Sequence, residues 1–174
     1  MPTILMGVTI MIRGRAMPRP QPIVQDDARA SYPAYDDDLV GWAAANAALL
    51  RAGRLSQVDG LHLAEELEDL GKSERRSLTS HLVNLMLHLL KWQLQPGLQD
   101  PSWRLSVNND RAAAAEILDD SPSLRPALPA LIDKAYPLAH RNALAETGLP
   151  EATFPQDCPY AIEQLLDDGF WPES

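Results

Sequence analysis

Cysteine is almost missing from this chain of 174 residues, which contains only Cys158. A single cysteine excludes an intramolecular disulfide, a four-cysteine zinc site and a redox-active dithiol. Such low cysteine usage is typical of proteins in a reducing compartment, so we expect a cytoplasmic location. No histidine close in the sequence is placed to act as a base for Cys158, and we interpret it as a small packing residue.

Positive charge is also scarce. The chain has 15 lysines and arginines against 24 aspartates and glutamates, a formal net charge of -9. Proteins that bind nucleic acid or an acidic membrane surface mainly through charge need a basic surface. We therefore expect neither nucleic acid nor a membrane as a partner. A concealed basic groove around Lys91, Arg104 and Arg111 is the arrangement that would overturn this expectation.

Long apolar runs are absent as well. The run from Ile4 to Ile12 is far shorter than the ~20 residues that a membrane helix needs. Residues 1–34 contain five of the fifteen prolines and four arginines against two aspartates. The net charge of this segment is +2, which leaves a net charge of -11 for residues 35–174. The composition predicts a disordered N-terminal arm, or one over-extended by a start codon placed too early, so that the true first residue is Met1, Met11 or Met17. The alternative is that the apolar run is a signal or partner-docking peptide.

The sequence shows neither strand alternation nor internal repeats, and from residue 35 onward its apolar spacing is helical. We expect an all-α protein, with a compact single-domain bundle of five to six helices over residues 35–174. Gly71 either separates two of these helices or lies inside a longer one. The expected helices cover residues 39–50, 59–70, 73–94 and 101–118. After a break at Ser121-Pro122-Ser123, a further helical region runs to Glu146-Thr147-Gly148, and a short last helix begins at Pro159.

The segment from Ser73 to Leu94 is the most apolar of these helices. Its leucines recur at steps of three and four around most of the circumference, which predicts a central helix. The polar residues that remain lie along one side of it: Ser77, His81, Asn84, His88 and Lys91. Trp92, near its end, is expected to pack in the core against Trp103 of the next helix.

Seven short motifs occur in a fixed order along the chain. They are YDDD, EELEDLGKSERRSL, HLLKWQ, SWR, SPSLRP, ETGLPEATFP and CPY. In this order the chain resembles the bacterial family of domain of unknown function 29 over residues 35–172. The resemblance implies an all-helical bacterial domain and no established reaction, ligand or cofactor. Pro129 and Pro137 depart from the family pattern, in which the corresponding sequence is uninterrupted. We therefore expect the helical region that runs to Glu146 to be bent.

The polar strip is the sharpest candidate for a site. We expect a polar cleft formed by a carboxylate and four residues of the strip: Glu66, His81, Asn84, His88 and Lys91. Its weak metal-binding version uses Glu66, His81 and His88, and a second weak metal set is His62, Glu65 and Glu66. The alternative is that the two histidines satisfy buried polar partners or face solvent. No cofactor is expected.

Two classes of function remain. The first is a protein-interaction or regulatory module without catalytic activity, whose acidic surface attracts a protein partner or further copies of the chain. The second is a small metal-assisted hydrolase built on Glu66, His81 and His88. The first class requires no residue that the chain lacks, and it is therefore the principal hypothesis.

Overall fold

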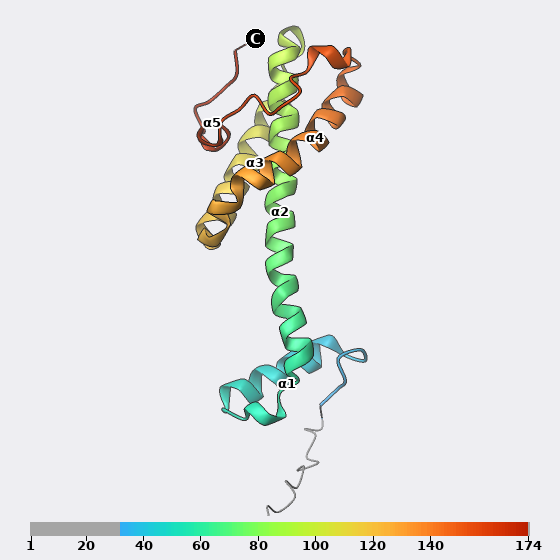
Figure 1. Ribbon diagram of the computed structural model, residues 1–174, viewed down its shortest axis with the longest axis vertical. Helices are drawn as coiled ribbons and strands as arrows, with labels where there is room; N and C mark the ends of the chain where they lie inside the picture. The colour runs from blue at the N-terminus through green and yellow to red at the C-terminus, as the bar shows by residue number, and fades with distance from the viewer. Residues whose placement is uncertain (1–31, 174) are drawn as a thin grey trace, which may run out of the picture. The chain divides into compact units, whose positions relative to one another are not determined.

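The structure is a computed structural model that describes residues 32–173 (Figure 1). The predicted arm, residues 1–34, lies almost wholly outside the described residues, and its boundary at residue 35 stays a prediction. Within the described range there are five α-helices and no strands, which confirms the all-α prediction. The chain divides into two compact units, one ending at Asp59 and the other beginning at Gly60.

The first unit is organised around α1, Leu39–Arg51. The helix begins because the Asp38 carboxylate accepts a hydrogen bond of 2.9 Å from the Gly41 N–H, as the acidic motif predicted. The helix ends at Arg51, and Gly53 just beyond it turns the chain with a φ of 69°, a conformation that favours glycine. The buried Asn46 side chain accepts from the Asp59 N–H at 2.8 Å and thereby holds the end of the unit against α1.

The second unit is built on α2, Gly60–Leu94, a continuous helix of 35 residues. Gly71 therefore lies inside a longer helix, the second of the two predicted alternatives. The segment after Gly71 is central, as predicted: Leu78, Leu82, Leu85 and Leu89 are fully buried. These side chains pack between α3, Pro101–Asp120, and α4, Leu128–Thr147 (Figure 1).

Of the helices that cover α2, α3 begins at the predicted Pro101, whereas α4 begins only at Leu128, after a separate 3-10 helix. The Asp100 carboxylate caps α3 by accepting from the Ser102 N–H at 2.7 Å, and Pro101 occupies the first turn. A short 3-10 helix, Pro122–Ala127, joins α3 to α4. Pro137 lies in the interior of α4, as predicted, and Gly148 closes that helix with a φ of 66°.

The C-terminal segment returns to the core through α5, Ile162–Leu166. This helix begins three residues later than the predicted start at Pro159. The Gln164 side chain accepts from the Ala161 N–H at 2.8 Å, and this contact holds the first turn at Ala161. Leu165 is fully buried in the core of the unit. No helix among residues 32–173 has the length and apolar character needed to cross a membrane.

Candidate functional site

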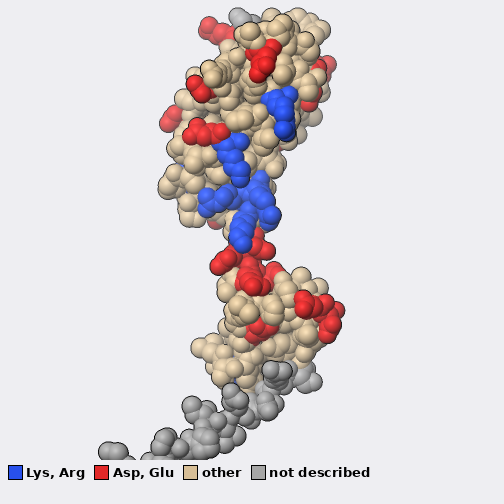
Figure 2. Space-filling view, turned by 45° about the vertical axis from the view of Figure 1, so that its right-hand side comes forward, with Lys and Arg blue, Asp and Glu red and all other residues tan. Residues whose placement is uncertain are grey.

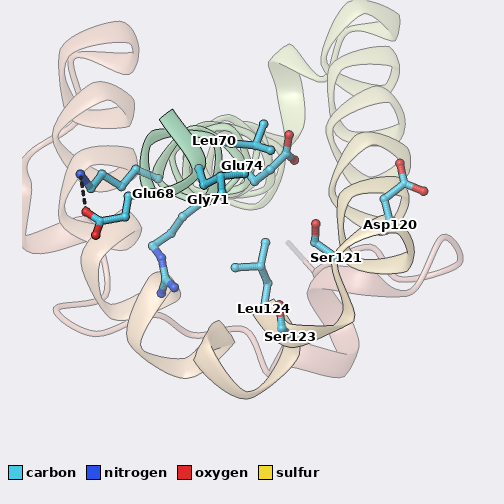
Figure 3. A pocket seen from close by; sticks show the side chains of 11 residues that line it. Glu68, Leu70, Gly71, Glu74, Asp120, Ser121, Ser123 and Leu124 are labelled. Carbon is cyan, nitrogen blue, oxygen red and sulfur yellow. Dashed lines mark ion pairs between the residues drawn. The ribbon is translucent and has the colours of Figure 1, made fainter. Parts of the chain in front are cut away.

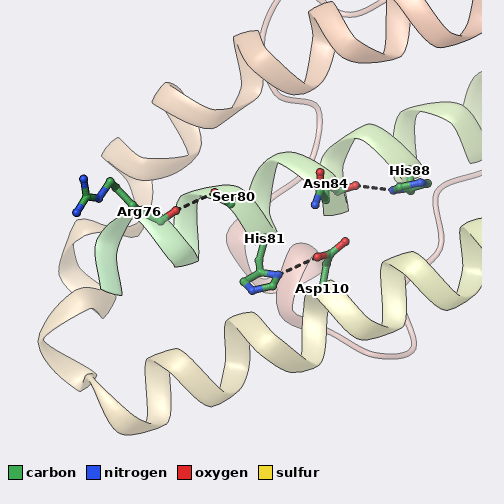
Figure 4. Close-up of polar contacts among 6 residues, drawn as sticks. All are labelled: Arg76, Ser80, His81, Asn84, His88 and Asp110. Atoms are coloured by element: carbon green, nitrogen blue, oxygen red, sulfur yellow. Dashed lines mark hydrogen bonds and ion pairs between the residues drawn. The ribbon is translucent and has the colours of Figure 1, made fainter. Parts of the chain in front are cut away.

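His81 contacts a residue that the sequence did not predict. Its Nδ1 lies 2.8 Å from Oδ1 of Asp110 on α3 (Figure 4). The Asp110 side chain is 13% exposed and that of His81 33% exposed. A carboxylate at this position orients the imidazole and links α2 to α3. Asp110 lies three residues after the buried Val107, so its place beside the inner face of α3 is the one signal that could have identified it.

The remaining histidine of the polar strip turns to its own helix. His88 Nδ1 lies 2.9 Å from the backbone oxygen of Asn84, one turn earlier (Figure 4). The side chain of Asn84 is exposed. His81 thus has its partner on α3, and His88 has its partner within α2. This arrangement agrees with the alternative in which each histidine satisfies a separate polar partner.

Lys91, the last residue of the strip, forms an ion pair in which the lysine is buried and its partner is half exposed. Its Nζ lies 2.6 Å from Oε2 of Glu146 on α4 and 4.5 Å from the ring centroid of Trp103 on α3. The lysine side chain is 10% exposed, so its aliphatic part is packed while its charge is paired. Lys91 therefore connects α2 with both covering helices and does not line an open cleft.

The structure does not bring Glu66 to the other residues of the predicted cleft. Glu66 and His81 lie on the same continuous helix, fifteen residues apart, which corresponds to roughly 22 Å along the axis. Among residues 32–173, no group of three or more histidines, cysteines, aspartates and glutamates is arranged to hold a metal ion. Both predicted metal sets, Glu66 with His81 and His88 and His62 with Glu65 and Glu66, are therefore not supported.

The three cations of the suspected basic groove are all engaged inside the second unit. Lys91 pairs with Glu146, and Arg111 is fully buried and donates to backbone carbonyls. The guanidinium of Arg104 lies 5.0 Å from the ring of Trp171 and 5.5 Å from that of Trp92. Trp92 itself contacts Trp171, with ring centroids 4.6 Å apart, and its pairing with Trp103 stays a prediction.

Cys158 has the surroundings of a packing residue. Its Sγ lies 3.6 Å from Sδ of Met86 and 3.6 Å from the backbone oxygen of Tyr160. Burial raises the pKa of the Cys158 thiol, although the hydrogen bond to Tyr160 acts in the opposite direction. The thiol is therefore not activated as a nucleophile.

This raised pKa has a measurable consequence. At neutral pH, Cys158 of the folded chain should be alkylated by iodoacetamide more slowly than in the chain unfolded by urea, because less of the thiol is ionised and its sulfur is half-buried. The rate of the folded chain should rise as the pH increases toward the raised pKa. Equal rates for the folded and unfolded chains at neutral pH would contradict this description of the site.

An open groove that the sequence did not predict lies within the second unit (Figure 3). It has a volume of about 650 Å³, with α2 as one wall and the junction of α3 with the following 3-10 helix as the other. Leu124, which is buried, and Leu70, which is exposed, contribute apolar lining. The lining residues from α2 are Leu67, Glu68, Leu70, Gly71, Lys72, Glu74 and Arg75, and those from the junction are Asp120, Ser121, Ser123 and Leu124.

Three leucines form an apolar stripe on the first half of α2, in line with the strip that carries Ser77, His81 and Asn84 further along the helix. Leu63, Leu67 and Leu70 follow at steps of four and three on one side of the helix. Leu67 is 63% exposed and Leu70 is 61% exposed. The same spacing thus serves burial in one half of α2 and exposure in the other.

Charge along this half of α2 is divided into two blocks. Glu65, Glu68 and Asp69 precede Gly71, and the basic residues Lys72, Arg75 and Arg76 follow it. Figure 2 shows acidic and basic side chains gathered in separate groups, with an acidic group directly beside a basic one. We call Leu63, Leu67 and Leu70, with Glu74 on the same side of the helix, the α2 face; most of the charge blocks lie on the other side of α2 (Figure 3).

Comparison with known proteins gives one match. A family profile described as "Domain of unknown function DUF29" matches residues 34–171, nearly the whole described range. No curated protein and no solved structure matches the chain. The family description assigns no reaction, and the geometry of the residues is the remaining guide to function.

Proposed function

The chain belongs to the family of Domain of unknown function DUF29, and on that premise we propose that it is a protein-interaction module without catalytic activity. One observation carries this proposal: Leu67 and Leu70 are exposed beside a groove of about 650 Å³ on a helix whose other half is buried. Contiguous exposed apolar surface that is rimmed by charged residues is typical of a protein-binding site.

The groove favours a helical partner. A helix that presents apolar side chains at steps of three and four can place them along Leu67 and Leu70, as amphipathic helices do in apolar grooves. The charged residues that line the groove, Glu68, Glu74 and Arg75, would then form a polar rim that sets the register and direction of that partner. This arrangement requires no metal or cofactor.

A protein partner agrees with the overall composition. The excess of 24 acidic over 15 basic residues disfavours nucleic acid, and the single cysteine favours a reducing, cytoplasmic location. We therefore propose that the partner is a protein and that the chain acts in the cytoplasm. The metal-assisted hydrolase is not favoured, because Glu66 and His81 are separated along one helix.

Site-specific photocrosslinking tests this proposal. We expect a photoreactive phenylalanine analogue in place of Leu67 or Leu70, in the full chain produced in its native host, to yield covalent adducts with a polypeptide. The same analogue at Leu105 on α3 is the matched control, because Leu105 is also 61% exposed and does not line the groove. Adduct yields at Leu67 and Leu70 that do not exceed the yield at Leu105 would contradict the proposal.

A further inference from the structure

The first helix of the described chain carries almost no polar side chain. Between Leu39 and Leu50, α1 contains no charged residue, and its one amide side chain, that of Asn46, is buried. A helix that faces water on one side normally carries charged or polar residues there, whereas a helix that is apolar all round is normally buried. The sequence of α1 therefore indicates that the whole circumference of this helix is covered.

The described residues cover only one side of α1. Trp42 and Leu49 are buried, and they are the only apolar side chains of residues 32–59 that are. On the remaining circumference Val40 is 79% exposed, Leu39 is 48% exposed and Leu50 is 41% exposed, with alanines between them. We call the following residues the outer face of α1: Leu39, Val40, Ala43, Ala44, Ala47 and Leu50.

The first unit also needs more apolar burial than residues 32–59 provide. A chain of fewer than about 40 residues seldom buries enough surface to be stable without further support. An additional apolar segment packed on the outer face of α1 would supply that burial.

The chain contains such a segment ahead of α1. Seven of the nine residues from Ile4 to Ile12 are apolar, and none of the nine is charged. Packing this apolar run on the outer face of α1, which is also uncharged, removes no charge from water. The two surfaces therefore match in chemical character.

The place where the described chain begins favours the same contact. The Tyr32 hydroxyl donates to the Gln57 carbonyl at 3.3 Å. The side chain of Pro33 lies 3.0 Å from the position that a Cβ on Gly41 would occupy, so the chain passes the first turn of α1. Nineteen residues separate Ile12 from Tyr32.

This connection is long enough to bring the apolar run to any part of the outer face. Fully extended, nineteen residues span up to about 60 Å, because each residue spans at most ~3.3 Å. The 13 residues of α1 extend over only about 20 Å. The tether also keeps the run at an effective concentration of roughly millimolar near the helix, an advantage that neither a second copy nor an unrelated protein has.

Charges at the ends of the two segments indicate the direction of the run. Asp36 and Asp37 lie just before α1, are exposed, and have no ion-pair partner among the described residues. Arg13 and Arg15 follow the apolar run directly. Pairing these arginines with the two aspartates places the end of the run at the start of α1, so the run lies antiparallel to the helix. Exposed pairs of this kind set direction more than they add affinity.

We propose that residues 4–12 of this chain cover the outer face of α1, antiparallel to the helix, with Arg13 and Arg15 beside Asp36 and Asp37. The apolar run is then a docking peptide whose partner is the first unit of its own chain, which is the alternative to an arm that is disordered throughout. This inference concerns a different surface from the α2 face and does not depend on the function proposed above.

Photocrosslinking within the purified full chain tests both the contact and its direction. A photoreactive phenylalanine analogue in place of Val40 should attach to residues 10–12, because Val40 lies in the first turn of α1. The same analogue in place of Leu50, in the last turn, should attach to residues 4–6. Mass spectrometry of the digested monomer identifies the attached residues.

The control position is Leu105 on α3, which is 61% exposed and should capture no residue of the run. Adducts of doubled mass at Val40 and Leu50 would assign the outer face to a second copy and overturn the proposal. Capture of the run no more often than from Leu105 would overturn it as well. Attachment with the two ends exchanged would contradict the antiparallel direction.

Hydrogen exchange tests the cover itself without any change in α1. One variant of the full chain removes apolar side chains from the run by Ile4→Ser, Ile10→Ser and Ile12→Ser. The matched control changes three residues outside the run by Pro18→Ser, Pro20→Ser and Pro22→Ser. In the first variant alone, the amides of α1 should exchange at least about tenfold faster, because uncovering the helix lowers its local stability.

The second unit provides an internal standard in the same experiment. The amides of α2, α3 and α4 should exchange at wild-type rates in both variants, which would show that the second unit stays folded. Unchanged exchange of α1 in the isoleucine variant, or equal acceleration in the proline variant, would overturn the proposal.

Discussion

Replacing Arg111 by methionine is expected to lower the free energy of unfolding by about 3 kcal/mol or more, the largest effect of any single substitution that we predict. The Arg111 side chain is fully buried. Its Nε donates to the Leu165 carbonyl at 2.9 Å, and one terminal nitrogen donates to the Phe170 carbonyl at 3.1 Å. Longer contacts reach the carbonyls of Gln164 and Asp168.

The reason for this effect is that one guanidinium satisfies the backbone of the C-terminal segment. Burial lowers the pKa of Arg111, while Asp168 and Asp167 act in the opposite direction. An arginine nevertheless stays charged in a protein, and charge-assisted hydrogen bonds are stronger than neutral ones. Methionine keeps most of the apolar volume but leaves several carbonyls of residues 164–170 without their donor.

Denaturant melts measure this loss, and hydrogen exchange shows where it occurs. The amides around α5 should exchange faster in the Arg111→Met variant than in the wild type, even before global unfolding. Arg104→Met is the matched control, because Arg104 is exposed and its guanidinium lies over the rings of Trp92 and Trp171. Loss of these cation–π contacts should lower the free energy of unfolding by only about 0.5–1 kcal/mol. Equal losses for the two variants would contradict the anchoring role of Arg111.

Leu85→Ala should lower the free energy of unfolding by about 2–5 kcal/mol. Leu85 is fully buried at the centre of α2, where α3 and α4 both pack, so truncation removes apolar contacts and leaves a cavity. Urea or guanidinium melts provide the measurement.

The control for this prediction is Leu105→Ala, at a leucine of α3 that is 61% exposed. Surface substitutions away from special features change stability by less than about 0.5 kcal/mol. If Leu85→Ala were as mild as Leu105→Ala, the central position of α2 would be wrong.

Helix type and most helix ends could be predicted because their causes are local. Asp38 and Asp100 cap helices through contacts within three residues of themselves, and Gly53 and Gly148 end helices through their own backbone conformation. Gly71 was ambiguous because an interior glycine costs only about 1 kcal/mol, which the packing of a long helix can offset.

The candidate site was less predictable because its contacts join distant parts of the chain. His81 and Asp110 are 29 residues apart, and no periodicity within either helix specifies that they meet. Arg111 lies between Val107 and Ala114 at helical spacing, so the inner stripe of α3 did contain a signal for its burial. Its charge concealed that signal, because arginine is seldom fully buried.

The exposure of Leu67 and Leu70 could not be predicted for a different reason. An apolar stripe has the same spacing whether it packs in a core or against a partner. Only the ends of α3 and α4 determine where the covering of α2 stops. An apolar stripe that the covering helices do not reach thus became visible only in the fold.

The most direct test of the α2 face is the identity of the polypeptide that a photoreactive residue at Leu67 captures. The account predicts a covalent adduct with a polypeptide, formed in higher yield than from the equally exposed Leu105. An adduct no more abundant than that from Leu105 would contradict the claim that this face binds protein.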